Sequence, residues 1–127
     1  MLIVIHAFED CFYGEHSFYS NIITRVEDRD EAEELAIQLS RDLINDSDEI
    51  LDILREGAYD LAIESGTADA DLEDRVEELM EDLVDEDVKY QVYHIKVNED
   101  QAIIDFYNYT DLDEFLEKYD HQLILSQ

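Results

Sequence analysis

Basic residues are scarce in this sequence, and cysteine, glycine and proline are rare or missing. Eight Lys and Arg stand against 36 Asp and Glu in 127 residues, so the formal net charge at pH 7 is −28. Nucleic acids and anionic membranes are bound mainly through clustered Lys and Arg, so direct binding to either is excluded. Cys11 is the one cysteine, which permits no internal disulfide and suits a reducing compartment such as the cytoplasm.

Long apolar runs are absent as well. No stretch of about 18 apolar residues occurs, so we expect no membrane-spanning helix. Residues 2–8 are apolar, but no basic segment precedes them and His6 interrupts them, which argues against a signal peptide. The three glycines, Gly14, Gly57 and Gly66, form no phosphate-binding loop. The length fits one domain over residues 1–127.

The acidity does not by itself predict disorder. Acidic chains stay unfolded when they have too few apolar residues to bury. Here 46% of the residues are hydrophobic, among them 13 Ile, 8 Tyr and 5 Phe, and proline is absent. Because the apolar residues also recur periodically, we expect a folded domain with a strongly acidic surface.

Alternating apolar residues predict strands near both ends of the chain. Residues 2–8 are apolar on both faces, which is typical of a strand inside a sheet. They are expected to form a hairpin with residues 18–26 through a turn over residues 9–15. Residues 88–97 are the clearest strand in the chain, and residues 121–125 can serve as a terminal strand.

Apolar residues spaced by three and four predict three helices in the middle of the chain. The first runs from residue 28 or 30 to about residue 45, the second covers about residues 49–65, and the third begins near residues 68–71. The expected inner stripes are Ile50, Ile53, Leu54, Ala58, Leu61 and Ala62 in the second helix, and Leu72, Val76, Leu79, Met80 and Leu83 in the third.

Residues 101–109 fit either a strand or a helix. The spacing of Ile103, Phe106 and Tyr107 favours a short helix. The density of β-branched and aromatic residues favours a strand. The sequence leaves both interpretations open for this segment.

The last predicted helix covers residues 111–119, where Asp111 and Glu114 form a capping-box pattern. Strands therefore lie at both ends of the chain and helices lie mainly in the middle. This order predicts an α+β fold, in which a small, mostly antiparallel sheet packs against about three central acidic helices.

No residue pattern identifies catalytic chemistry. With 36 carboxylates, any two can be combined into an acid–base pair, so a glycosidase-type pair is not singled out. Cys11 lies near His6 and His16, but its surroundings match no known thiol enzyme and it is expected as a small filler residue. We therefore expect a protein that is not an enzyme and has no cofactor.

Patterns of metal ligands are also missing. His6 and His94 lie in predicted strands and could face each other across a ladder, but no Cys-x-x-Cys or His-x-x-x-His spacing accompanies them. The acidic stretches that begin at Asp46 and Asp69 do not fit an EF-hand loop. We expect no dedicated metal site and only weak surface binding of divalent ions.

The second and third predicted helices carry rows of acidic residues. Spacings of three and four place five acids on one face of the second helix, and residues 69–87 hold eleven acids with one base. The predicted partner-binding residues are Glu49, Asp52, Glu56, Asp60 and Glu64 in the second helix, and Asp71, Asp74, Glu77, Glu78, Glu81, Asp82 and Asp85 in the third.

The acidic segment of the third predicted helix, residues 69–87, has a charge density close to that of a nucleic acid. If residues 69–87 are helical throughout, they extend about 28 Å with one net charge per ~2.8 Å, against ~3.4 Å along one DNA strand. Like charges four residues apart cost about 0.2–0.5 kcal/mol per pair, so folding gives no reason for this pattern. Solubility needs less charge. The many Ile and Tyr residues fit adaptation to high salt poorly.

These features resemble those of the DNA-mimic proteins of phages and mobile elements. The resemblance lies in charge, size and the two acidic helix faces in residues 49–64 and 69–87. It covers no block that can be aligned, so no contact residue of that class is transferred to this chain. Such proteins occupy the nucleic-acid-binding clefts of restriction enzymes, CRISPR effectors and other nucleic-acid-binding proteins.

The expected function is therefore a non-enzymatic nucleic-acid mimic that blocks the channel of a basic host defence protein. As a phage protein it would act in the host cytoplasm as an anti-restriction or anti-CRISPR inhibitor, with exposed Tyr107 and Tyr109 adding specificity. One alternative is an immunity protein or antitoxin that neutralises a basic toxin. Another is an acidic protein whose charge serves solvation and whose ligand site involves His6, His94 or Cys11. A homodimer remains open.

Overall fold

Four strands form one antiparallel sheet in the order β2-β1-β3-β4. The computed structural model describes residues 1–10, 17–109 and 111–127. The strands are β1 (Leu2–Asp10), β2 (Ser17–Arg25), β3 (Tyr90–Ile95) and β4 (His121–Ser126). The α+β class, the antiparallel sheet, the N-terminal hairpin and the terminal strand are thus confirmed.

β1 occupies an inner position of the sheet, between β2 and β3. Leu2, Ile3, Val4 and Ile5 are all fully buried, because side chains on both faces of an inner strand meet a layer of helices. The predicted turn began too early in the chain, since Glu9 is the last but one residue of β1. The rest of that predicted turn, which includes Cys11 and Gly14, falls largely outside the described residues.

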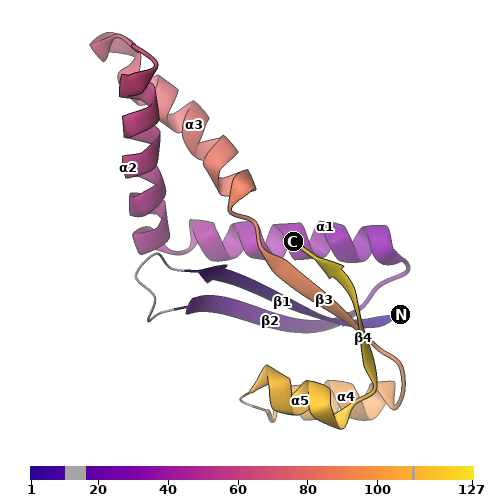
Figure 1. Cartoon of the computed structure of the whole chain (residues 1–127). Coiled ribbons are helices and arrows are strands. Elements are labelled where there is room, and N and C mark those ends of the chain that lie inside the picture. Colours follow the sequence, from indigo (N-terminus) through magenta and orange to yellow (C-terminus); the bar gives the residue numbers. More distant parts are fainter. Residues whose placement is uncertain (11–16, 110) are drawn as a thin grey trace.

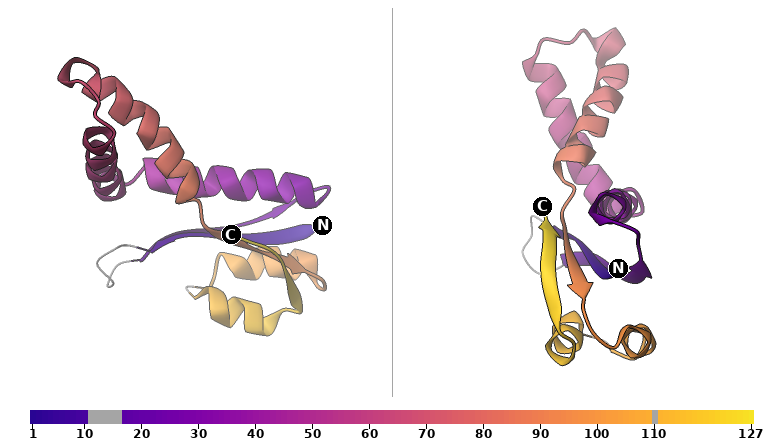
Figure 2. Two further views of the ribbon diagram at one scale, coloured as in Figure 1. Left: turned by 45° about the horizontal axis from the view of Figure 1, so that its top comes forward. Right: turned by 90° about the vertical axis from the view of Figure 1, so that its right-hand side faces the viewer.

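Helices cover both faces of the sheet (Figure 2). On one face, α1 (Arg29–Asn45) buries Ala32 and Ala36 against Ile3 and Ile5. The other face packs against α4 (Glu99–Phe106) and α5 (Leu112–Lys118). The core on that side comprises Leu2, Val4, Ile23, Ile95, Ala102, Phe115, Leu116 and Tyr119.

The two remaining helices form a hairpin that projects from one end of the body (Figure 1). They are α2 (Asp48–Glu64) and α3 (Leu72–Glu86), the latter preceded by a 3-10 turn at Asp69–Asp71. Ala58, Ala62 and Val76 are buried between them. We call residues 48–87 the acidic arm. Of the three central helices, α1 makes the main contact with the sheet, and α2 and α3 pack chiefly on each other.

Local sequence signals account for where these helices begin and end. The Asp28 carboxylate accepts a hydrogen bond from the Glu31 amide at the start of α1, and the Ser47 hydroxyl accepts one from the Ile50 amide at the start of α2. Gly66 follows α2 with φ of +77°, a left-handed conformation that favours glycine. Asp111 caps α5 through the Asp113 amide.

Residues 101–109, which the sequence left open, are helical as far as Phe106 and lie mostly in α4. Ala102 is fully buried, and Ile103 and Phe106 pack against the same core, while Ile104 faces solvent. One face of the segment is therefore apolar and packed at three- and four-residue spacing, and this periodicity outweighs the β propensity of its residues.

A polar cluster joins α4 to the C-terminal end of α5 and the residue that follows it. Asp105 accepts a hydrogen bond from Lys118 Nζ at 2.8 Å and a second from the Tyr119 hydroxyl. These donors, with Lys118 contributing most, lower the pKa of Asp105 to about 2.

Candidate functional site

All twelve acidic residues predicted from the sequence lie exposed on the acidic arm. Glu49, Asp52, Glu56, Asp60 and Glu64 come from α2, Asp71 from the 3-10 turn, and Asp74, Glu77, Glu78, Glu81, Asp82 and Asp85 from α3. Because α2 and α3 are antiparallel neighbours, the two rows belong to one structural unit that stands away from the sheet (Figure 1).

The charge density of the arm lies close to that of a nucleic acid. The α3 helix itself is shorter than the 28 Å expected for residues 69–87, since its 15 residues span about 22 Å. It carries eight acids and Arg75, so one net charge falls at about every 3.2 Å, near the ~3.4 Å of one DNA strand. With six acids and Arg55 on α2 included, the hairpin carries about one net charge per 2 Å, against ~1.7 Å for duplex DNA.

Few of these charges are neutralised inside the molecule. Among the described residues, two of the twelve acids take part in ion pairs. Glu78 lies 3.0 Å from Arg75 within α3, and Asp85 lies 2.8 Å from Arg41 of α1. Both acids remain more than half exposed, so the pairs leave the arm strongly negative.

The buried stripe of α2 is narrower than predicted. Ile50, Leu54, Ala58 and Ala62 are buried, but Leu61 is 44% exposed and therefore was wrongly assigned to the inner face. The reason is that the contact between α2 and α3 follows these four buried residues, which recur every four positions along α2. Leu61 lies beside this row and outside the contact. The outcome is an apolar side chain on the outer surface of the acidic arm.

Tyr107 and Tyr109, the aromatic residues expected to add specificity, differ in exposure. Tyr107 is 75% exposed, whereas Tyr109 is partly buried against Phe115. Both lie at or beyond the end of α4, on the face of the sheet opposite α1. A contact by Tyr107 would therefore be separate from the contacts of the arm.

His6 and His94, which could have faced each other across a ladder, do not do so. His6 lies opposite Asn21 and Gln91, and His94 lies opposite Ile3 and Gln122. The two histidines also belong to opposite faces of the sheet, because side chains alternate along each strand. Cys11 and His16 fall outside the described residues. Within the described part of the chain, no group of three or more His, Cys, Asp or Glu side chains could hold a metal ion.

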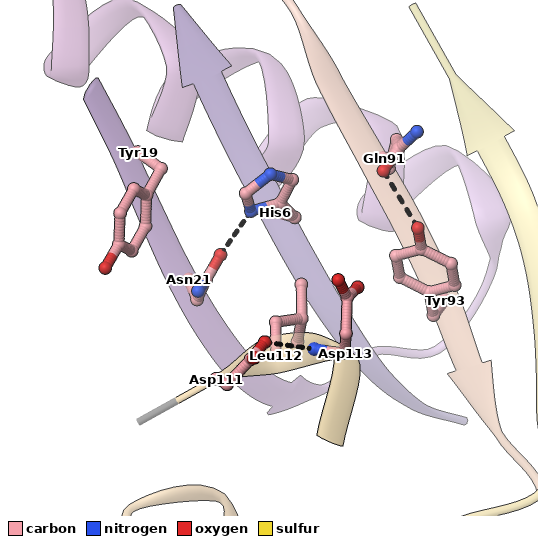
Figure 3. A pocket seen from close by; sticks show the side chains of 8 residues that line it. All are labelled: His6, Tyr19, Asn21, Gln91, Tyr93, Asp111, Leu112 and Asp113. Carbon is pink, nitrogen blue, oxygen red and sulfur yellow. Dashed lines mark hydrogen bonds between the residues drawn. The ribbon is translucent and has the colours of Figure 1, made fainter. Parts of the chain in front are cut away.

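A groove of about 390 Å³ lies beside His6, on the face of the sheet that carries α4 and α5 (Figure 3). His6 Nδ1 donates a hydrogen bond to Asn21 Oδ1 at 2.5 Å, and the Tyr93 hydroxyl donates one to Gln91 Oε1 at 2.8 Å. The start of α5 forms the opposite wall. The lining residues are His6, Tyr19, Asn21, Gln91, Tyr93, Asp111, Leu112 and Asp113.

The sequence analysis missed this groove, although the strands carry a signal for it. On the α4–α5 face, β1 changes from buried Val4 to His6, and β2 changes from Ile23 to Asn21. A strand face that turns from apolar to polar along its length marks the end of the packed core. That the polar residues of three strands lie side by side depends on the register, which the sequence does not reveal.

No protein-family model, curated protein or solved structure matches the chain. In the three described ranges, every helix is too short or too polar to span a bilayer.

Proposed function

We propose that this protein is a non-enzymatic nucleic-acid mimic that occupies the binding channel of a basic nucleic-acid-binding defence protein of the restriction or CRISPR effector type. The observation that carries the proposal is the acidic arm, on which all twelve predicted acids are exposed over two packed helices. A surface needed only for solubility would not require so much charge on one hairpin.

The physical basis of binding would be that the acidic arm, a polyanion, replaces the nucleic acid, also a polyanion, in the channel. Each carboxylate of the arm would take the place of a phosphate and pair with an Arg or Lys of the channel. Binding would release the counterions held by both surfaces, as it does when a protein binds DNA. Attraction between the arm and the channel would also make association fast and sensitive to salt.

The shape of the arm supports the same reading. The hairpin stands away from the sheet, so it can enter a channel while the body stays outside (Figure 1). The exposed side chains of Leu61 and Ile63 add apolar contacts beside the acidic rows. Apolar contacts of this kind would let the arm distinguish one basic channel from another.

The direct test measures displacement of a labelled DNA duplex from purified restriction enzymes and CRISPR effectors by fluorescence anisotropy. We expect competitive displacement from at least one of them, with an affinity that falls at least about tenfold between 50 and 200 mM NaCl. Binding that is indifferent to salt, or that leaves bound DNA in place, contradicts mimicry. Neutralisation of a basic toxin without a nucleic-acid site would instead support the immunity-protein alternative.

A matched pair of variants separates the arm from total charge. The arm variant replaces four exposed acids of α3, and the control replaces four exposed acids elsewhere, so both lose the same charge. We expect the arm variant to bind at least about 100-fold more weakly and the control to bind within about threefold of the parent. Equal losses would show that net charge alone matters. The arm set is Asp74, Glu77, Glu81 and Asp82, and the control set is Glu34, Glu114, Glu117 and Asp120, each changed to the corresponding amide.

A further inference from the structure

The groove beside His6 has a lining that selects for positive charge. Asp111 and Asp113 supply two carboxylates from the start of α5, and the described residues that line the groove include no Lys or Arg. Asp113 lines the groove together with His6 and Tyr93 (Figure 3). Burial raises the pKa of Tyr93, and the charge of Asp113 raises it further. An anionic ligand would meet two carboxylates and no permanent cation here, so the groove suits a cation.

The groove also offers aromatic surfaces to a planar cation. Tyr19 is 60% exposed, and its ring lies 6.2 Å from the His6 ring, centroid to centroid. The Tyr93 ring lines the other side of the groove. A guanidinium group stacks on aromatic faces and pairs with a carboxylate through two parallel hydrogen bonds, whereas an ammonium group is a compact, strongly hydrated charge.

Two hydrogen bonds fix the polar side chains that line the groove. Because Asn21 Oδ1 can only accept, the proton at this contact resides on His6 Nδ1. Tyr93 is held by its hydrogen bond to Gln91. These side chains are therefore already held in place before a ligand binds, which lowers the entropic cost of binding.

A neighbouring hollow provides room for an apolar stem. Its volume is about 270 Å³, and it shares Tyr19, Asn21, Asp111 and Leu112 with the groove. Its other lining residues include the aromatic side chains Phe106, Tyr109 and Phe115. A ligand can thus place a charged head beside Asp113 and a short aliphatic chain against Leu112.

We infer that this groove binds a guanidinium group carried on a short aliphatic stem, as in an arginine side chain. The carboxylate of Asp113 pairs with the guanidinium, Tyr93 stacks on it, and Tyr19 and Leu112 contact the stem. The site lies on the opposite face of the sheet from α1 and involves no residue of the acidic arm. It therefore does not depend on the proposed function.

The experiment is an NMR titration of the full-length ¹⁵N-labelled chain with Nα-acetyl-arginine amide. We expect saturable shifts at His6, Asn21 and Asp113 with a Kd of about 1 mM, and non-saturating shifts on the arm. Nα-acetyl-lysine amide has the same charge without the planar head, and we expect it to bind at least about fivefold more weakly. Absence of a saturable shift in the groove up to about 20 mM overturns the inference.

Two variants with the same net charge complete the test. Asp113→Asn removes the carboxylate from the groove, and Asp74→Asn removes one from the arm. We expect about tenfold weaker binding for Asp113→Asn and unchanged binding for Asp74→Asn. Tyr19→Leu, which keeps apolar bulk without a ring face, should also weaken binding. Because both Asp113 and Tyr19 are exposed, the spectra should show intact folds. Equal effects of Asp113→Asn and Asp74→Asn would contradict a specific site.

A further probe distinguishes the source of the guanidinium group. n-Propylguanidine has the same head and stem and the same charge but lacks the peptide groups. Equal affinity for n-propylguanidine and the arginine amide assigns the groove to a small free guanidine. At least about tenfold tighter binding of the amide assigns it to an arginine within a polypeptide. Both results support a guanidinium site, and failure of both probes to bind overturns it.

Discussion

Arg41 of α1 lies 2.8 Å from Asp85 of α3, and this ion pair links the acidic arm to the helix that packs on the sheet. Both side chains are about half exposed, so the pair is worth about 0.2–1 kcal/mol. Its position matters more than its strength, because it bridges the two structural units of the chain.

The link predicts a local effect of Arg41→Met. We expect amide hydrogen exchange to speed up in α2 and α3 while exchange in β1 stays nearly unchanged, since the core of the sheet keeps its contacts. Arg75→Met is the control, because it removes the same charge but breaks a pair within α3 itself. Equal protection in the two variants would show that the Arg41 pair does not hold the arm.

Asp105 predicts an acid-dependent loss of stability. Its pKa of about 2 in the folded protein lies below the value of about 3.9 expected after unfolding, so its contribution is present above about pH 4 and is lost as the pH falls towards 2. Asp105→Asn should therefore reduce the urea midpoint at pH 7, and the difference from the parent should shrink between pH 4 and pH 2. A difference that is independent of pH over this interval would rule out the assignment.

Tyr119→Phe tests the cause of the low Asp105 pKa. The variant removes one of the donors to the carboxylate but keeps Lys118 and the aromatic packing on Phe115. We expect the pKa of Asp105 to rise towards its ordinary value, measured from the side-chain carboxyl ¹³C shift during an NMR titration. An unchanged value would mean that the hydroxyl contributes nothing.

Two glycines, one inside α2 and one just beyond its C-terminal end, predict opposite effects of the same change. Gly57 lies inside the helix with open space around an added Cβ, so Gly57→Ala should stabilise by about 0.5–1 kcal/mol. Gly66 has φ of +77°, so Gly66→Ala should destabilise by about 1 kcal/mol. Urea midpoints of the two variants check both signs, and a shift in the same direction for both would contradict the helix boundary.

The acidic arm predicts that stability rises with salt. Within α3, Glu73, Glu77, Glu81 and Asp85 repeat at four-residue spacing, and each such like-charge contact costs about 0.2–0.5 kcal/mol at low ionic strength. Screening at about 0.3 M NaCl should remove much of this cost and raise the melting temperature. The variant with four α3 acids neutralised should respond less to salt than the control with four acids neutralised elsewhere. If the melting temperatures of the two variants rise equally with salt, the repulsion does not come mainly from the arm.

Local patterns predicted most of the secondary structure. The helix starts follow from Asp28 and Ser47, and the hairpin, the terminal strand and α1 to α3 follow from periodicity over a few residues. The exposure of all twelve arm acids was also predictable, because a charged side chain opposite an apolar stripe faces solvent. Where two local signals conflicted, at residues 101–109, the packing of Ala102 and Phe106 on the core decided for a helix.

The candidate sites were predictable to different degrees. The acidic rows consist of neighbours on single helices, so their spacing was visible in the sequence. The residues that line the groove come from β1, β2, β3 and the start of α5. Long stretches of chain separate β2 from β3 and β3 from α5, so local patterns do not show that these residues meet. Whether His6 and His94 meet could not be predicted for the same reason, because it depends on the register, which places His94 opposite Ile3.

The sequence by itself determined the acidity of the surface, most of the helices and strands, and the two acidic rows. Each of these depends on composition or on residues that are close together in the chain. The tertiary structure decided that α2 and α3 form a projecting arm, that Leu61 stays exposed, and that His6 lines a groove with Asp113. These outcomes depend on contacts between segments far apart in the chain, where the free energy of packing and strand pairing selects among arrangements that local patterns leave equivalent.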